Sequence, residues 1–195
     1  WPGDTPTHRA ISGDWLDMPV PAASVDAVIG DGVMTVVGGR AARLSLFAQI
    51  PRTLRPGGRA ALRLFAAPEG GDSLDAIKDD GLAGRIATTS ELAMRLFFAM
   101  PRSAPDYLLD YLDVFKMFES TFPDRTPLMR ACGFVPDDFA FLDLYATSQT
   151  SNSWAPAATA AEEASQSFGE VSLVPTTGYP RSEWCPLLLL SKPRA

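Results

Sequence analysis

Two short apolar segments, separated by one segment of helix length, restrict the fold of this chain more than any other feature. Val25–Gly30 (VDAVIG) and Arg59–Ala66 (RAALRLFA) are apolar, partly β-branched and bounded by turn residues, as buried strands are. Between them, Ala41–Leu54 has the apolar spacing of a helix. Strand, helix and strand in this order predict a parallel crossover, and therefore an α/β fold with a largely parallel, buried sheet.

The helix expected at Ala41–Leu54 carries one broad apolar face and one proline. The residues of that face are Leu44, Phe47, Ala48 and Leu54. Pro51 lies inside the segment, where it removes a backbone hydrogen bond, so we expect a kink or a restart there. The sequence RPGG at Arg55–Gly58 then predicts a stop before the second strand.

The rest of the chain predicts a helical stretch and a closing pair of strands. Helical spacing recurs at Ser73–Ala83, Ser90–Met100, Asp106–Thr121, Thr126–Cys132 and Pro156–Ser167. Further strands are expected at Arg9–Ser12, Glu170–Thr176 and Cys185–Ser191, while Thr147–Ser167 is low in complexity and the stretch we expect to be most mobile. We predict a single domain with a parallel-sheet part (1–67), a helical insertion or lid (68–167) and a terminal strand pair (168–195).

Composition excludes several classes of function. The 195 residues carry a net charge of −6 with no cluster of lysine and arginine, which argues against nucleic acid or an anionic membrane as the partner. No apolar run approaches the roughly 20 residues of a membrane span. Cys132 and Cys185 are isolated, which fits free thiols in a reducing cytoplasm better than a disulfide. With His8 as its one histidine, the chain cannot build a metal site from several histidines, and no metal is expected.

Charged residues follow or end several of the expected strands. Asp14 closes the first strand and Asp31 the second, and in an open parallel sheet ligands bind beyond such carboxyl ends. Each aspartate also has a simpler explanation: Asp14 as the cap of a turn, and Asp31 as a turn residue between Gly30 and Gly32. Arg63, near the end of the third strand, is suited to an acidic substrate group or to a buried partner.

Aromatic residues form a stripe on the helix expected at Asp106–Thr121. The stripe consists of Tyr107, Tyr111, Phe115 and Phe118. Such a stripe more often packs a helix onto its domain than lines a binding site. We keep Tyr107 and Tyr111 as weak candidates for contact with a substrate.

Three segments in order resemble class I S-adenosylmethionine-dependent methyltransferases of the type 11 group. They are GDWLDMPVPAASVDAVIGDG, LFAQIPRTLRPGGRAALRLFA and the closing YPRSEWCPLLLL, which is similar to the end of small bacterial members. The match covers about a third of the chain well. It implies a Rossmann-like, mostly parallel sheet with a terminal antiparallel pair, S-adenosylmethionine as cofactor, and methyl transfer to a small molecule.

The resemblance also assigns roles to residues. Asp14 matches the aspartate that accepts a hydrogen bond from the adenine amine, and Trp15 matches the residue that flanks the adenine ring. Gly30, Asp31 and Gly32 would lie under the reactive end of the cofactor. Asp31 would orient the cofactor or the acceptor, or act as a general base, and it is the one weak candidate for a catalytic residue.

The sequence departs from the family pattern at its start. The family's glycine-rich turn and ribose-binding acidic residue precede the segment that matches Ile11–Pro19, and neither is present here. We therefore expect a chain that lacks the first two strands, is inactive as it stands, and has an open sheet edge through which it forms homo-oligomers. The alternative is a non-catalytic relative that binds a partner through the same edge.

Overall fold

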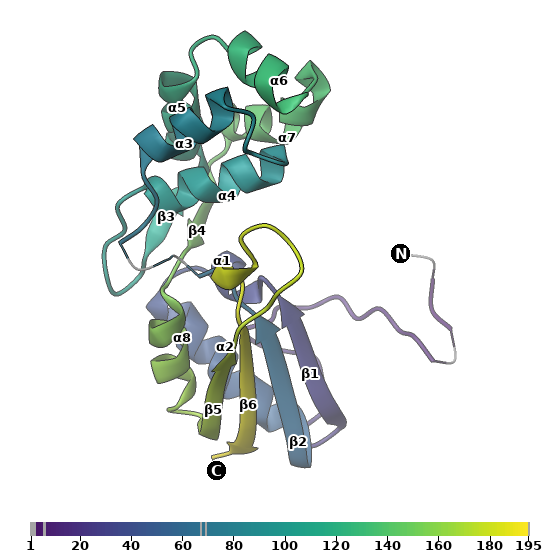
Figure 1. Cartoon of the computed structure of the whole chain (residues 1–195). Coiled ribbons are helices and arrows are strands. Elements are labelled where there is room, and N and C mark those ends of the chain that lie inside the picture. The colour runs from purple at the N-terminus through teal and green to yellow at the C-terminus, as the bar shows by residue number, and fades with distance from the viewer. Residues whose placement is uncertain (1–2, 6, 67, 69, 195) are drawn as a thin grey trace.

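The computed structural model describes residues 3–5, 7–66, 68 and 70–194, and it has two parts (Figure 1). A four-stranded sheet with two helices on one face forms the lower part in Figure 1. A group of helices forms the upper part, and a loop between the last two strands reaches up toward it. Within the described ranges, every helix is too short or too polar to cross a lipid bilayer.

The sheet contains β1 (Val25–Asp31), β2 (Leu54–Arg63), β6 (Leu187–Pro193) and β5 (Phe168–Val174) in that spatial order. β1 and β2 are parallel, and β6 lies antiparallel between β2 and β5. Three of the four strands therefore run in one direction. The α/β class, the parallel crossover and the antiparallel terminal pair are confirmed.

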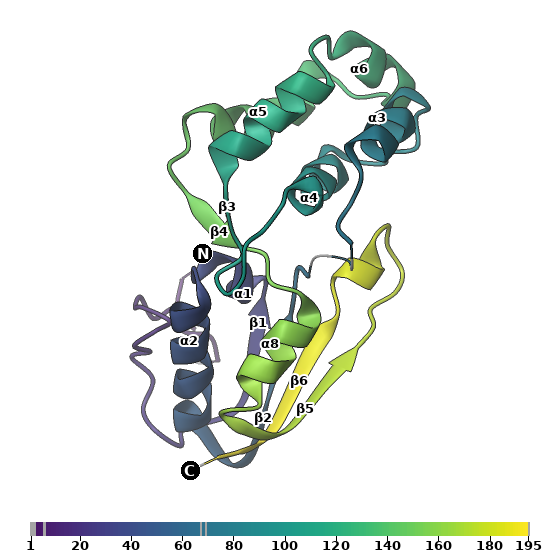
Figure 2. The same cartoon turned by 90° about the vertical axis from the view of Figure 1, so that its left-hand side faces the viewer.

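Helices α2 (Arg40–Thr53) and α8 (Ala157–Ala164) cover one face of the sheet (Figure 2). α2 continues through Pro51 and ends two residues later, so the predicted restart is wrong. Pro51 lies in the last turn, where it lacks the N–H that would bond the Phe47 carbonyl. The buried face of α2 also differs from the predicted one: Arg43 is buried and Ala48 is exposed.

In the part of the chain that the structure describes, no helix covers the other face of the sheet (Figure 1). The strand register places Ile29, Ala61, Leu189 and Ser172 in one row across it. Ile29 is 84% exposed, and the outer edge of β1 pairs with no other strand among the described residues. The opposite row, which includes Ala60 and Leu190, is buried under α2 and α8.

Two predictions for the sheet need correction. Arg9–Ser12 is not a strand, because no neighbouring strand of the described chain pairs with it and all four residues are exposed. The RPGG segment does not precede the strand but lies inside β2. Opposite it, the pairing register of β1 with β2 shifts between Val25 and Ala27, and Gly57 adopts a φ of +81°. The bulge absorbs these residues, so that the regular pairing begins at Arg59.

The helical insertion has its own apolar core. Its helices are α3 (Leu74–Leu82), α4 (Thr89–Ala99), α5 (Tyr111–Thr121), α6 (Thr126–Cys132) and α7 (Ala140–Asp143), with short 3-10 turns at Pro136–Phe139 and Leu144–Thr147. α4 begins one residue before the predicted Ser90, and Thr88 caps it by accepting a hydrogen bond from Glu91 N at 3.0 Å. Gly133 follows α6 as its cap in the left-handed conformation.

A small antiparallel pair alters the boundaries of the insertion. β3 (Leu108–Asp110) pairs with β4 (Ser151–Ser153), so α5 begins at Tyr111 instead of Asp106. Tyr107, with a φ of +56°, therefore lies outside the helix and its aromatic stripe. Residues 147–167 contain β4 and α8, and α8 packs on the sheet with α2 instead of within the insertion.

Arg43 of α2 joins the two parts of the molecule. Its guanidinium is fully buried and donates two hydrogen bonds of 2.8 Å to Glu163 of α8. It also donates to the Asp106 carbonyl (2.9 Å), the Pro105 carbonyl (2.8 Å) and Ser153 Oγ (2.5 Å). One side chain thus links α2 and α8 of the sheet part to β4 and to the chain just before β3.

Candidate functional site

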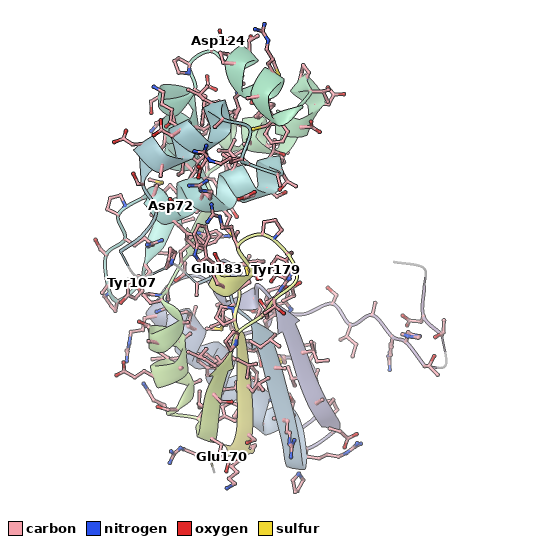
Figure 3. The ribbon with its side chains drawn as sticks, in the orientation of Figure 1. Asp72, Tyr107, Asp124, Glu170, Tyr179 and Glu183 are labelled. Atoms are coloured by element: carbon pink, nitrogen blue, oxygen red, sulfur yellow. The ribbon has the colours of Figure 1, made fainter. Side chains whose placement is uncertain are left out.

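A cavity of about 700 Å³ lies between the carboxyl ends of β1 and β2 and the helical insertion. The sheet side contributes Trp15, Asp31, Gly32 and Arg63, and the insertion contributes mainly aromatic side chains. The loop between β5 and β6 borders it with Tyr179, which Figure 3 shows at the junction of the two parts. This volume is typical of small-molecule sites.

An ion pair forms the sheet side of the cavity, which we call the floor. Asp31 and Arg63 are partners in the parallel register, and Arg63 Nε and Nη2 each donate a hydrogen bond of 2.7 Å to a different carboxylate oxygen of Asp31. These hydrogen bonds raise the pKa of Arg63 above its usual value. Each oxygen of Asp31 accepts one of these hydrogen bonds and keeps a second lone pair for a ligand.

The glycines beside Asp31 are required by packing. Gly32 has a φ of +64°, its N–H donates to the Arg63 carbonyl at 3.0 Å, and a Cβ there would lie 2.6 Å from Phe65 Cε2. A Cβ on Gly30 would lie 2.8 Å from Leu62 Cδ2. The close contacts of this segment therefore account for both glycines without a ligand.

Asp14 and Trp15 lie on the extended segment that precedes β1. Asp14 Oδ1 accepts a hydrogen bond of 2.8 Å from Leu16 N, so the side chain caps a turn, and Oδ2 has no partner among the described residues. Trp15 is 52% exposed and borders the cavity. Asp14 therefore caps a turn, as the simpler of its two explanations predicts, and its Oδ2 remains available to accept a hydrogen bond from a ligand.

Aromatic side chains form the opposite side of the cavity, which we call the wall. Phe97 and Trp154 stack with centroids 4.4 Å apart and ring planes 21° apart. Tyr111 and Tyr145 lie with their centroids 4.4 Å apart, and Phe97 meets Tyr111 edge-on at 5.1 Å. Asn152 Nδ2 donates a hydrogen bond of 2.6 Å to the Tyr111 hydroxyl.

Burial controls the ionisation of the groups around this wall. It raises the pKa of Tyr145 to about 12 and also raises the pKa of Tyr111. Both phenols are therefore protonated at neutral pH and can donate hydrogen bonds. Burial likewise raises the pKa of the Cys185 thiol, which makes it a poor nucleophile.

The structure separates the two tyrosine candidates. Tyr111 lines the cavity, whereas Tyr107 lies beside Arg43, whose Cζ is 5.9 Å from the ring centroid, and outside the cavity. Figure 3 shows Tyr107 and Tyr179 on opposite sides of the junction. Among the described residues, no three His, Cys, Asp or Glu side chains are grouped to hold a metal ion.

Several cavity residues were not anticipated from the sequence. Phe97, Tyr145 and Trp154 come from α4, a 3-10 turn and the residue after β4. The apolar spacing of the sequence predicts a helix that contains Phe97. It does not show which residues from other segments line the same side of a cavity. Comparison with models of known protein families gives no match, and comparison with curated proteins gives none either.

Proposed function

We propose that the protein transfers a methyl group from S-adenosylmethionine to a small-molecule acceptor in this cavity. The observation that supports the proposal is that candidates from separate segments of the sequence meet at one site. Trp15, Asp31 and Gly32, assigned to the cofactor, and Arg63 and Tyr111, assigned to the substrate, line the same cavity. The strand order, with β6 antiparallel between β2 and β5, is compatible with a Rossmann-like methyltransferase sheet. A cytoplasmic location belongs to the same proposal.

In this proposal the protein acts by binding and alignment. S-adenosylmethionine supplies an electrophilic methyl group when bound. The free oxygen of Asp14 would accept from the adenine amine and Trp15 would cover the ring. The floor would provide the polar contacts of the site, and the wall would bind the methyl acceptor. Holding two reactants in line accounts for much of a bimolecular rate enhancement, so no histidine base is required.

The residues of this chain fit only the adenine side of the cofactor. Among the described residues, no strand precedes β1, so the segment ahead of β1 has neither a glycine-rich turn after a strand nor an acidic residue at a strand end. Each missing polar contact is worth about 1 kcal/mol or more. We therefore expect the 195-residue chain by itself to bind S-adenosylmethionine too weakly to measure.

Calorimetric titration with S-adenosylmethionine tests the proposal. The 195-residue chain and the product of the complete gene are titrated in parallel. Saturable binding by the complete product, with methyl transfer to an acceptor, supports the enzyme. Absence of binding by both contradicts it.

A second candidate is a non-catalytic module that binds a second copy of this chain, and the open sheet favours it. β1 pairs with β2 on one side only, its outer edge has no partner strand among the described residues, and its Ile29 is 84% exposed. Size-exclusion chromatography with light scattering would then show a dimer that Ile29→Lys dissociates. A monomer that binds the cofactor would rule out this alternative.

A further inference from the structure

We propose that the wall of the cavity binds a planar, uncharged aromatic molecule that carries a hydrogen-bond acceptor. The binding itself is argued from the geometry below. The inference rests on the proposed function only in identifying this molecule as the methyl acceptor.

The shape of the wall selects a flat ligand. Phe97 stacks on Trp154, and Phe65 lies on Trp154 at a centroid distance of 6.4 Å with the planes 29° apart. Their nearly parallel planes give the cavity a layered side. Two aromatic rings stabilise each other beyond the area that they bury, and a partner that is not flat cannot make this contact. A saturated molecule of equal size would lose this part of the binding.

The hydroxyls beside this wall select an acceptor group. The Tyr111 oxygen already accepts a hydrogen bond from Asn152, so its own proton is available for donation. The Tyr145 hydroxyl has no hydrogen-bond partner among the described residues and is partly buried. A ligand oxygen or nitrogen between the two phenols would satisfy both donors.

The charges around the cavity disfavour an anion. The described residues that line it include one cation, Arg63, and Asp31 already neutralises that guanidinium. Glu91 also lines the cavity, where it accepts hydrogen bonds from Ala87 N and Arg181 Nε. Burial opposes ionisation of the two phenols, and it would oppose a carboxylate on the ligand in the same way.

Calorimetry with three probes of similar size tests the selection. The probes are 2-naphthol, which is planar and uncharged at neutral pH, 2-naphthoate, which is planar and anionic, and 2-decalol, which is uncharged and saturated. We expect 2-naphthol to bind, and the other two to bind at least about tenfold more weakly. No cofactor is added, so the result does not depend on methyl transfer.

Three variants locate the binding. Phe97→Leu removes the stacked ring and should weaken 2-naphthol binding at least about fivefold. Tyr145→Phe keeps the ring and removes the hydroxyl, which should weaken it about threefold to tenfold. Tyr107→Phe is the matched control, because Tyr107 lies outside the cavity, and it should leave the affinity unchanged. Circular dichroism and thermal unfolding verify that each variant folds.

The outcomes separate this inference from the proposed function. Failure of 2-naphthol to bind, or equal binding of the three probes, overturns the inference. The inference is also overturned if the Phe97→Leu and Tyr145→Phe variants bind 2-naphthol as tightly as the unsubstituted protein does. If 2-naphthol binds as expected and the complete gene product neither binds S-adenosylmethionine nor transfers its methyl group, the inference stands and the proposed function fails.

Discussion

The two sides of the cavity are built in different ways. The floor is an ion pair between neighbouring parallel strands, and its carboxylate is 63% exposed. The wall is aromatic and comes from two helices, a 3-10 turn and the chain after β4, segments that the insertion's own packing brings together. The floor therefore depends on local strand register, whereas the complete cavity depends on how the insertion sits on the sheet.

Substitution of Arg43 should have the largest effect, because this residue holds the two sides together. Arg43→Met keeps much of the volume but leaves Glu163 buried without its bidentate partner. Removing one partner of a buried ion pair costs about 3–5 kcal/mol of unfolding free energy. Urea denaturation measures the loss, and binding at the wall should fall with it.

The matched control is an exposed ion pair of the sheet. Arg55 pairs with Asp26, and their side chains are 51% and 81% exposed. Arg55→Met should change the unfolding free energy by less than about 1 kcal/mol. Equal losses in the two variants would show that Arg43 is not the link between the parts.

Gly32→Ala tests the floor alone. The substitution places a Cβ against Phe65 and imposes a left-handed φ on alanine, at a combined cost of about 2–4 kcal/mol. Gly133→Ala is the control, since its φ of +74° carries the same strain while no atom lies within 4 Å of the added Cβ. The difference in urea midpoint between the two variants measures the contact with Phe65, and similar midpoints would argue against that contact.

The sequence predicted the floor better than the wall. Asp31 and Arg63 end neighbouring parallel strands, and this placement follows from strand patterns and from the crossover rule. The parallel pairing of β1 with β2 and the terminal β5–β6 pair follow from the same local patterns. The structure differs at Arg9–Ser12, where the local pattern is that of a strand but the described chain has no neighbouring strand to pair with it.

The wall could not be predicted because its contacts are distant in the sequence. Trp154 follows a stretch of small polar residues that resembles a mobile linker, yet Asn152, Ser153 and Trp154 are all buried. Arg43 lies at a position that apolar periodicity assigns to the surface. Its burial depends on partners that are distant in the sequence, above all Glu163, which lies 120 residues later. Single-sequence patterns contain no information about such pairs.

Asp14→Asn tests the sheet side of the proposed cofactor site. Asparagine can still accept the hydrogen bond from Leu16 N, so stability should be nearly unchanged. Loss of a charge-assisted hydrogen bond to the adenine amine should weaken cofactor binding by about 1.5–3 kcal/mol in the complete gene product. Saturated turnover should change less, because adenine is remote from the transferred methyl. Unchanged cofactor affinity would leave Asp14 as the cap of a turn.

The pH dependence of stability tests the wall and has the smallest expected effect. Tyr145 has a pKa of about 12 in the folded protein, above the value of 10.0 of an unperturbed tyrosine. Between about pH 10 and pH 12 the unfolded chain releases this proton and the folded protein retains it, so the stabilisation is complete below pH 10 and is lost as pH rises. The slope from this one group is below about 1.4 kcal/mol per pH unit, because Tyr145 is partly exposed. Urea denaturation across this range should therefore show a shallower decline for Tyr145→Phe than for the unsubstituted protein, and identical slopes would mean that the Tyr145 hydroxyl is as well solvated in the folded protein as in the unfolded chain.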